Sequence, residues 1–225
     1  MRKVILFDLD DTLAPEDDFI RSGYSKVAEF LKEKYGAKDD ASIRLYSLYK
    51  EDPKLVFNRF LEDEGIPYTD EDIKELIRVY REHEPKVDYY PDVLPNLYKL
   101  RDMGARLGII SDGYAVSQRN KLNVLKTKGI FDKIIITDEL GREYWKPDIR
   151  SFIMMKEAFG AKWEDMVYVG DNPGKDFYIG RDRMIATIRI YREGSVYENA
   201  PYYENIKESI GIGSFDELPD AIKRV

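Results

Sequence analysis

The sequence contains no cysteine, and His83 is the single histidine among its 225 residues. Without cysteine the chain can form neither disulfides nor thiolate metal sites. One histidine also excludes a zinc site built from several imidazole ligands. Any metal site in this protein must therefore use oxygen ligands, which favour Mg²⁺ or a similar hard cation.

Two further absences restrict the environment and the partners. The chain has no run of ~18 apolar residues of the kind that spans a membrane, and a strand pattern stands where a signal peptide would have its apolar segment. The net charge is −7 and there is no long basic run, which argues against nucleic acid as a partner. We expect a cytoplasmic monomer or homodimer that acts on a small molecule. A charged fraction of 35% without cysteine is typical of proteins from hot environments.

The pattern of apolar residues predicts an α/β fold. From residue 92 onward, helical periodicity alternates with short apolar strands, as in a parallel sheet wound with helices. We expect a Rossmann-like sheet of about five or more strands with helices on both faces, formed by residues 1–15 and 88–225. Residues 16–87 are expected to form an all-helical insert. The predicted strands cover residues 3–7, 105–110, 133–137, 166–169 and 184–190; the predicted helices cover 19–35, 41–50, 53–64, 70–82, 93–103, 115–128, 149–159, 175–183 and 216–223.

Acidic residues directly follow the first predicted strand. Asp8, Asp10 and Asp11 occupy three of the four positions after the apolar run. Carboxylates crowded at the buried end of a strand repel one another unless a metal ion or an ammonium group neutralises them. The carboxyl end of a parallel strand is also where open α/β sheets bind ligands. This segment therefore predicts a cation site.

Polar residues also end two later strands, and one lysine lies in a third loop. Ser111 to Gly113 precede a helix, so a hydroxyl and backbone N–H groups there could hold an oxyanion. Asp171 and Asp176 lie in the Gly-rich loop after the strand at 166–169. Lys146 is the one cation well placed to offset these acids. A phosphate dianion cannot approach them without a divalent ion and an ammonium group, so the charges predict metal dependence.

The residues described above belong to four sequence blocks, and these blocks resemble, in the same order along the chain, the four motifs of the haloacid dehalogenase-like hydrolase superfamily. The resemblance spans residues 3–190, and each block closes a predicted strand or precedes a helix. The helical insert is similar to the small cap of type C1 members. Asp10 is an acid where the dehalogenating branch has none, so the resemblance favours the phosphatase branch. The four blocks are Asp8-Leu9-Asp10-Asp11-Thr12, Ser111-Asp112-Gly113, Lys146-Pro147-Asp148, and Gly170-Asp171 with Asp176.

The resemblance implies a Mg²⁺-dependent phosphatase with a covalent aspartyl-phosphate intermediate. Asp8 would be the nucleophile and Asp10 the general acid and base. Lys146 would stabilise charge on the phosphoryl group. The substrate would be a small phosphorylated metabolite, such as a sugar phosphate, a triose phosphate such as glyceraldehyde 3-phosphate, or phosphoglycolate. The implied phosphate-binding residues are Thr12, Ser111, Asp112, Gly113 and Lys146, and the implied Mg²⁺ ligands are Asp8, Asp10 through its backbone carbonyl, Asp171 and Asp176.

Some assignments stay open. Asp176 would bind a metal-bound water or orient Lys146. Asp112 stands where asparagine is frequent in the family, and its contact with phosphate would use either the side chain or only the backbone N–H. Each acid alone would more often be a helix cap or turn residue. Three other functions are also compatible with parts of the pattern: a phosphosugar mutase that uses the same phosphoaspartate, a non-catalytic regulator that binds Mg²⁺ and phosphometabolites, and a two-component receiver.

Overall fold

The computed structural model describes residues 4–183 and 185–225 of the chain. Its contacts divide the chain into two compact units, one formed by Met1–Glu16 with Asp88–Val225 and the other by Asp17–Val87. The roles of hydrolase core and cap that the sequence suggests for these regions stay predictions. Within the described residues, no helix is long and apolar enough to cross a membrane.

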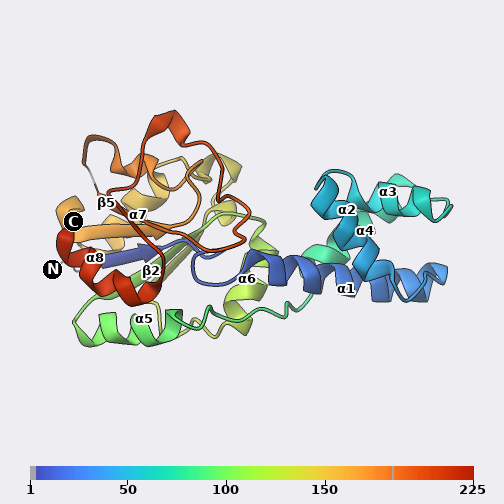
Figure 1. Cartoon of the computed structure of the whole chain (residues 1–225), viewed down its shortest axis with the longest axis horizontal. Helices are drawn as coiled ribbons and strands as arrows, with labels where there is room; N and C mark the ends of the chain where they lie inside the picture. The colour runs from blue at the N-terminus through green and yellow to red at the C-terminus, as the bar shows by residue number, and fades with distance from the viewer. Residues whose placement is uncertain (1–3, 184) are drawn as a thin grey trace. The chain divides into compact units, whose positions relative to one another are not determined.

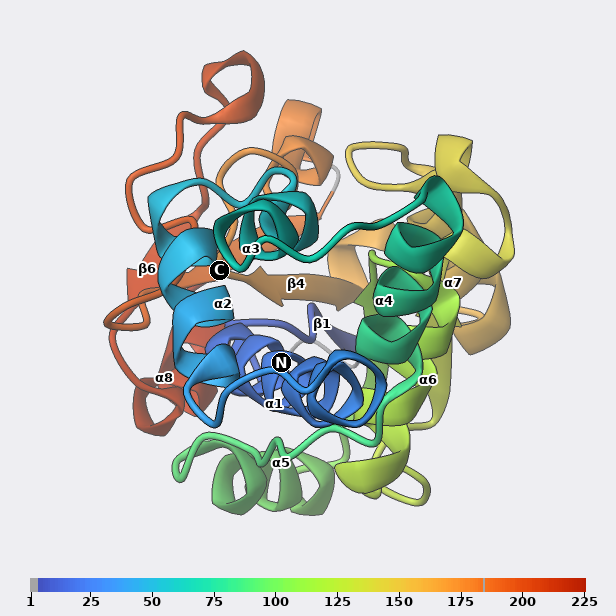
Figure 2. The ribbon, with the colours of Figure 1, turned by 90° about the vertical axis from the view of Figure 1, so that its right-hand side faces the viewer.

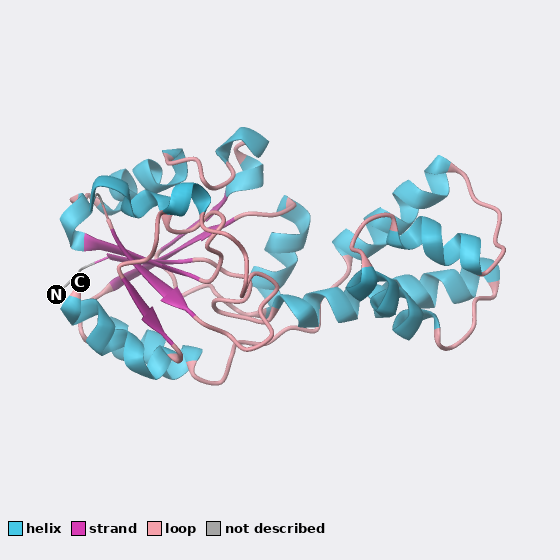
Figure 3. Ribbon diagram, turned by 45° about the horizontal axis from the view of Figure 1, so that its top comes forward, coloured by secondary structure: helices cyan, strands magenta, loops and turns pink. Residues whose placement is uncertain are grey.

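The first unit is built on one six-stranded parallel sheet. Figures 1 and 3 show helices packed around this sheet. The strand order is β3-β2-β1-β4-β5-β6, so β1 lies in the middle between β2 and β4. The prediction of a parallel α/β sheet is confirmed. The strands are β1 (Val4–Phe7), β2 (Arg106–Ser111), β3 (Lys133–Ile136), β4 (Met166–Gly170), β5 (Ala186–Ile190) and β6 (Ile210–Ile212).

Both faces of the central strand are covered, which explains why all four of its residues are apolar. Val4 and Leu6 pack with Phe152 in one buried cluster. Phe7 points to the opposite face and stacks on Phe215, with ring centroids 5.8 Å apart. Alternate residues of a strand point to opposite faces, so a strand buried on both sides reads as a continuous apolar run. The helices of this unit are α5 (Val93–Asp102), α6 (Ala115–Val124), α7 (Arg150–Phe159) and α8 (Leu218–Arg224).

One prediction for this unit was wrong, and one strand was missed. The segment 175–183 is not an α-helix; the structure has a 3₁₀ helix at Tyr178–Arg183 instead. The side chain of Asp176 accepts a hydrogen bond from the backbone N–H of Asn172, which favours a tight turn at the expected helix start. The strand β6 was not predicted at all. The expected fifth strand is present as β5, and the expected residues 3 and 184 lie outside the described residues.

The second unit contains only helices and has a hydrophobic core of its own. Figure 2 shows its helices in blue to teal. Ile20, Leu31, Leu45 and Phe60 are buried together in this core. Thr69 and Asp72 form a capping box at the start of the last helix, which satisfies backbone N–H groups there. The helices are α1 (Glu16–Tyr35), α2 (Ala41–Glu51), α3 (Val56–Asp63) and α4 (Asp70–Glu82), and the boundary between the units falls at the first residue of α1.

Candidate active site

The predicted motifs meet at the carboxyl ends of three adjacent strands. Phe7 of β1 pairs with Ile109 of β2 and Val169 of β4, so the loops that follow these strands leave the sheet at the same edge. A cavity of about 320 Å³ lies there. All of its lining residues belong to the first compact unit. The lining includes six residues that the sequence indicated, namely Asp8, Asp10, Asp112, Gly113, Lys146 and Asp171.

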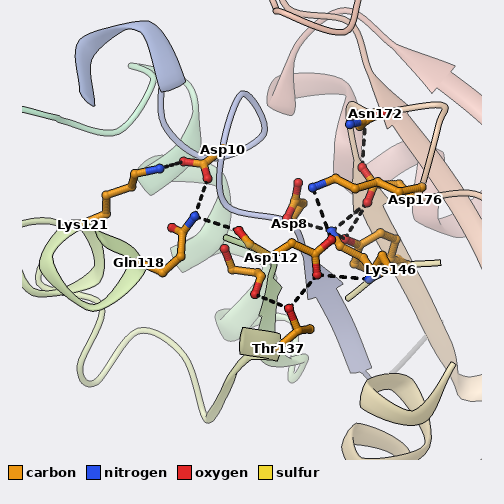
Figure 4. A network of polar contacts seen from close by, with 12 residues as sticks. Asp8, Asp10, Asp112, Gln118, Lys121, Thr137, Lys146, Asn172 and Asp176 are labelled. Carbon is orange, nitrogen blue, oxygen red and sulfur yellow. Dashed lines mark hydrogen bonds and ion pairs between the residues drawn. The ribbon is translucent and has the colours of Figure 1, made fainter. Parts of the chain in front are cut away.

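Lys146 connects two of the predicted acids in the buried part of the site (Figure 4). Its Nζ donates to Asp8 Oδ1 at 2.9 Å, to Asp176 Oδ1 at 2.8 Å and to the Tyr168 hydroxyl at 2.7 Å. These bonds use all three ammonium hydrogens. Burial alone would lower the pKa of Lys146, but the carboxylates of Asp176 and Asp8 hold it well above its usual value. Lys146 is therefore a cation at any physiological pH.

Asp8 is held in its ionised form. Burial acts to raise its pKa, but attraction to Lys146 and Lys175 outweighs burial and holds the pKa below its ordinary value. The backbone N–H of Leu9 adds a further hydrogen bond that favours the carboxylate. An ionised oxygen is what a nucleophilic carboxylate needs.

Three buried carboxylates fit a divalent cation. Asp8, Asp171 and Asp176 each offer an oxygen, and these oxygens all lie within 4.8 Å of one another. Burial and the charges of Asp176 and Asp8 raise the pKa of Asp171 well above its ordinary value. Ser195, which the sequence did not single out, donates to Asp171 Oδ2 at 2.8 Å. A donor set of carboxylate oxygens under mutual repulsion matches the requirements of Mg²⁺.

Asp10 is oriented by the helix α6 rather than by the Lys146 cluster (Figure 4). Lys121 Nζ donates to Asp10 Oδ1 at 2.6 Å, and Gln118 Nε2 donates to Asp10 Oδ2 at 2.8 Å. Gln118 Nε2 also donates to the backbone carbonyl of Asp112 at 2.7 Å. Sequence reasoning missed both residues of α6. The available signal was two polar side chains, three residues apart, on a helix face that the structure buries.

The predicted phosphate-binding residues differ in their surroundings. Thr12 and Ser111 are fully buried, are not among the residues lining the cavity, and their hydroxyls have no hydrogen-bond partner among the described residues. Gly113 lines the cavity and has φ +120, and a Cβ there would lie 2.5 Å from Gln118 Nε2. This position therefore needs a glycine.

The unusual acid at position 112 has its own partners. Asp112 Oδ1 accepts hydrogen bonds from the Thr137 hydroxyl at 2.7 Å and from the backbone N–H of Lys146 at 3.2 Å. Lys175 Nζ lies 3.4 Å from Asp112 Oδ2. Lys175 also lines the cavity, although the sequence analysis did not include it. The site thus holds a second lysine that balances the extra carboxylate.

We expect Gly170→Ala to weaken metal binding. A Cβ at this position would lie 2.5 Å from Asp176 Oδ2, so the buried carboxylate that binds Lys146 would have to leave its present position. We expect the dissociation constant for Mg²⁺ to rise ~10- to 100-fold, the usual cost of disturbing groups around a metal site. Gly213→Ala is the matched control because its nearest neighbour would be at 3.5 Å. Equal dissociation constants for Mg²⁺ in both variants, measured by calorimetry, would contradict this prediction.

Known proteins resemble this chain over most of its length. A family model described as haloacid dehalogenase-like hydrolase matches residues 5–190. A protein of Methanopyrus kandleri named glyceraldehyde 3-phosphate phosphatase is 31% identical, with 100% of this chain and 99% of that protein covered. A protein of Methanocaldococcus jannaschii with the same name is 29% identical at the same coverage.

A solved structure agrees with these matches. The HAD phosphatase from Thermococcus onnurineus is 27% identical and has a TM-score of 0.60, with 98% of this chain and 97% of that chain covered. The predicted fold class and the predicted hydrolase superfamily are confirmed. The chain belongs to the haloacid dehalogenase-like hydrolase family.

Proposed function

We propose that this enzyme is a Mg²⁺-dependent phosphatase that hydrolyses a small phosphorylated metabolite through an acyl phosphate on Asp8. The names of the relatives support the class of phosphoric monoester hydrolase. The main structural support is the ionised carboxylate of Asp8, which the buried Lys146 ammonium holds at the edge of the sheet beside two further acids. Glyceraldehyde 3-phosphate is the first substrate to test, with sugar phosphates and phosphoglycolate next.

In the proposed reaction Asp8 attacks phosphorus in line with the ester oxygen. The Asp8 Oδ–P bond forms while the ester P–O bond breaks, and Asp10 gives a proton to the leaving alcohol oxygen. Water then attacks phosphorus while Asp10 takes its proton, and the Asp8 Oδ–P bond breaks to release inorganic phosphate. Each oxygen of Asp10 accepts one hydrogen bond, from Lys121 or Gln118, and keeps a lone pair for the proton because Asp10 also lines the cavity.

The chain's cations would balance the charge of the phosphoryl group. Lys146 and Lys175 both line the cavity and lower the pKa of Asp8, so their fields reach the position where phosphate would be attacked. Asp8, Asp171 and Asp176 would hold Mg²⁺, together with the backbone carbonyl of Asp10. When bound, Mg²⁺ would screen the carboxylates from the phosphate dianion and stabilise negative charge in the transition state.

The proposal is tested by measuring inorganic phosphate release from a panel of small phosphate esters, with Mg²⁺ and with a chelator. We expect release that requires Mg²⁺ and a ranking led by a triose or sugar phosphate. A mutase would keep the phosphate on the sugar and release none. A folded protein that binds Mg²⁺ but releases phosphate from no ester would contradict the proposal.

A further inference from the structure

Glu16 lines the cavity, yet the proposed mechanism does not use it. It is fixed to the first compact unit at the start of α1, because its backbone N–H donates to Asp11 Oδ1 at 2.9 Å. Asp11 has a left-handed backbone with φ 51 and also accepts from the backbone N–H of Val196 at 3.1 Å. Two segments far apart in the sequence therefore hold Asp11, and Asp11 in turn holds the backbone of Glu16 at the cavity.

The carboxylate of Glu16 faces a negative environment. Burial first, and then the charge of Asp10, raise its pKa to about 7, and attraction to Lys121 only partly offsets them. Throughout residues 4–183 and 185–225, no group forms a hydrogen bond or an ion pair with this carboxylate. Glu16 is half-buried, and a carboxylate without a hydrogen-bond partner in the protein leaves its acceptor oxygens available to a ligand.

Glu16 and Asp10 line the same cavity, and Asp10 forms an isolated β-bridge with Ala14, two residues before Glu16. Asp10 acts on Glu16 more strongly than any other charged group, and Asp10 is the residue proposed to protonate the leaving oxygen. The cations in the described lining are Lys146 and Lys175. Lys146 is bonded to Asp8 and Asp176, and Lys175 lies beside Asp112. Near Glu16 the described lining thus offers acids and no free cation for a second anionic group.

We propose that Glu16 is a specificity-determining residue that selects phosphate esters whose leaving group is an uncharged alcohol or aldehyde and rejects those that carry a carboxylate. Its oxygens accept hydrogen bonds from the hydroxyl groups of a polyol or a hydrated aldehyde. A substrate carboxylate would be placed against the like charges of Glu16 and Asp10. This inference rests on the proposed phosphatase function and narrows its substrate class.

Two esters with the same carbon skeleton test this inference. Glyceraldehyde 3-phosphate and 3-phosphoglycerate differ by an aldehyde against a carboxylate at C1. At pH 8.5, where Glu16 is ionised, we expect the native enzyme to prefer the aldehyde by at least ~100-fold in kcat/KM. Glu16→Gln should reduce this preference at least ~10-fold by raising kcat/KM for 3-phosphoglycerate. Glu157→Gln, on an exposed position of α7, is the matched control and should keep the native preference.

Failure of the inference can be told apart from failure of the proposed function. Phosphate release from no ester would contradict the phosphatase function itself. If the native and Glu16→Gln enzymes are both active and prefer glyceraldehyde 3-phosphate to the same extent, the role of Glu16 is overturned. A native enzyme that hydrolyses both esters equally would also overturn it. If Glu16→Gln hydrolyses neither ester, calorimetry gives the ratio of the dissociation constants of the two esters. A ratio unchanged from the native protein would overturn the inference, and a ratio shifted toward 3-phosphoglycerate would support it.

Discussion

Asp8→Asn is expected to lower kcat for phosphate release by at least ~10⁴-fold, in line with the loss of nucleophiles from other enzymes that use covalent intermediates. The amide has nearly the same shape as the carboxylate but is neutral and a poor nucleophile. It also replaces one of the three carboxylates that would hold Mg²⁺ with a neutral group. Lys146 keeps its bonds to Asp176 and Tyr168 in this variant, so the fold should persist.

The activity of Asp8→Asn should be measured as inorganic phosphate release at saturating Mg²⁺, with circular dichroism to confirm folding. Asp102→Asn is the matched control because Asp102 is an exposed residue at the end of α5. The control should retain native kcat. If Asp8→Asn keeps kcat within ~10-fold of native, Asp8 is not the nucleophile, because a neutral amide cannot sustain covalent catalysis.

Lys146→Met is expected to impair both catalysis and stability. We expect kcat to fall by ~10³-fold, the upper range for removing a group that stabilises developing negative charge. The free energy of unfolding should fall by about 3–5 kcal/mol, because Asp8 and Asp176 would remain buried without their cation. Urea denaturation of the metal-free protein measures this loss. Saturating Mg²⁺ should restore part of it, since a cation bound to the acids stabilises the folded state.

Lys175→Met provides a comparison for that result. Lys175 keeps 23% of its side chain exposed and lies 3.4 Å from Asp112, whereas the Lys146 side chain is fully buried. Loss of Lys175 should therefore cost clearly less stability than loss of Lys146. Equal stability losses in the two variants, or none in Lys146→Met, would contradict the view that Lys146 neutralises the buried acids.

The sequence was sufficient to predict how the main motifs gather at one edge of the sheet. Asp8, Asp112 and Asp171 each directly follow an apolar strand, and parallel neighbouring strands bring their carboxyl ends together. Four blocks in the family's order also identified the superfamily. These inferences succeeded because strand ends and strand direction can be read from local patterns. The individual roles of the residues stay predictions.

Other features of the site depend on tertiary packing that no local pattern reports. Lys121 reads as an ordinary surface lysine of an amphipathic helix, yet it is buried and ion-paired with Asp10, 111 positions away along the chain. Glu16 reads as a helix-start acid, and its place in the cavity depends on Asp11 and the distant segment at Val196. The short strand β6 has three residues, too few for a periodic signal.

Detection of an acyl phosphate on Asp8 would test the proposed mechanism most directly. The enzyme would be mixed with glyceraldehyde 3-phosphate and Mg²⁺, quenched during turnover and reduced with borohydride, which converts an acyl phosphate of aspartate into homoserine. Mass spectrometry of the peptides should then find homoserine at position 8, and none when substrate is omitted. An enzyme that releases phosphate under these conditions but carries the reduced residue at another position would contradict nucleophilic attack by Asp8.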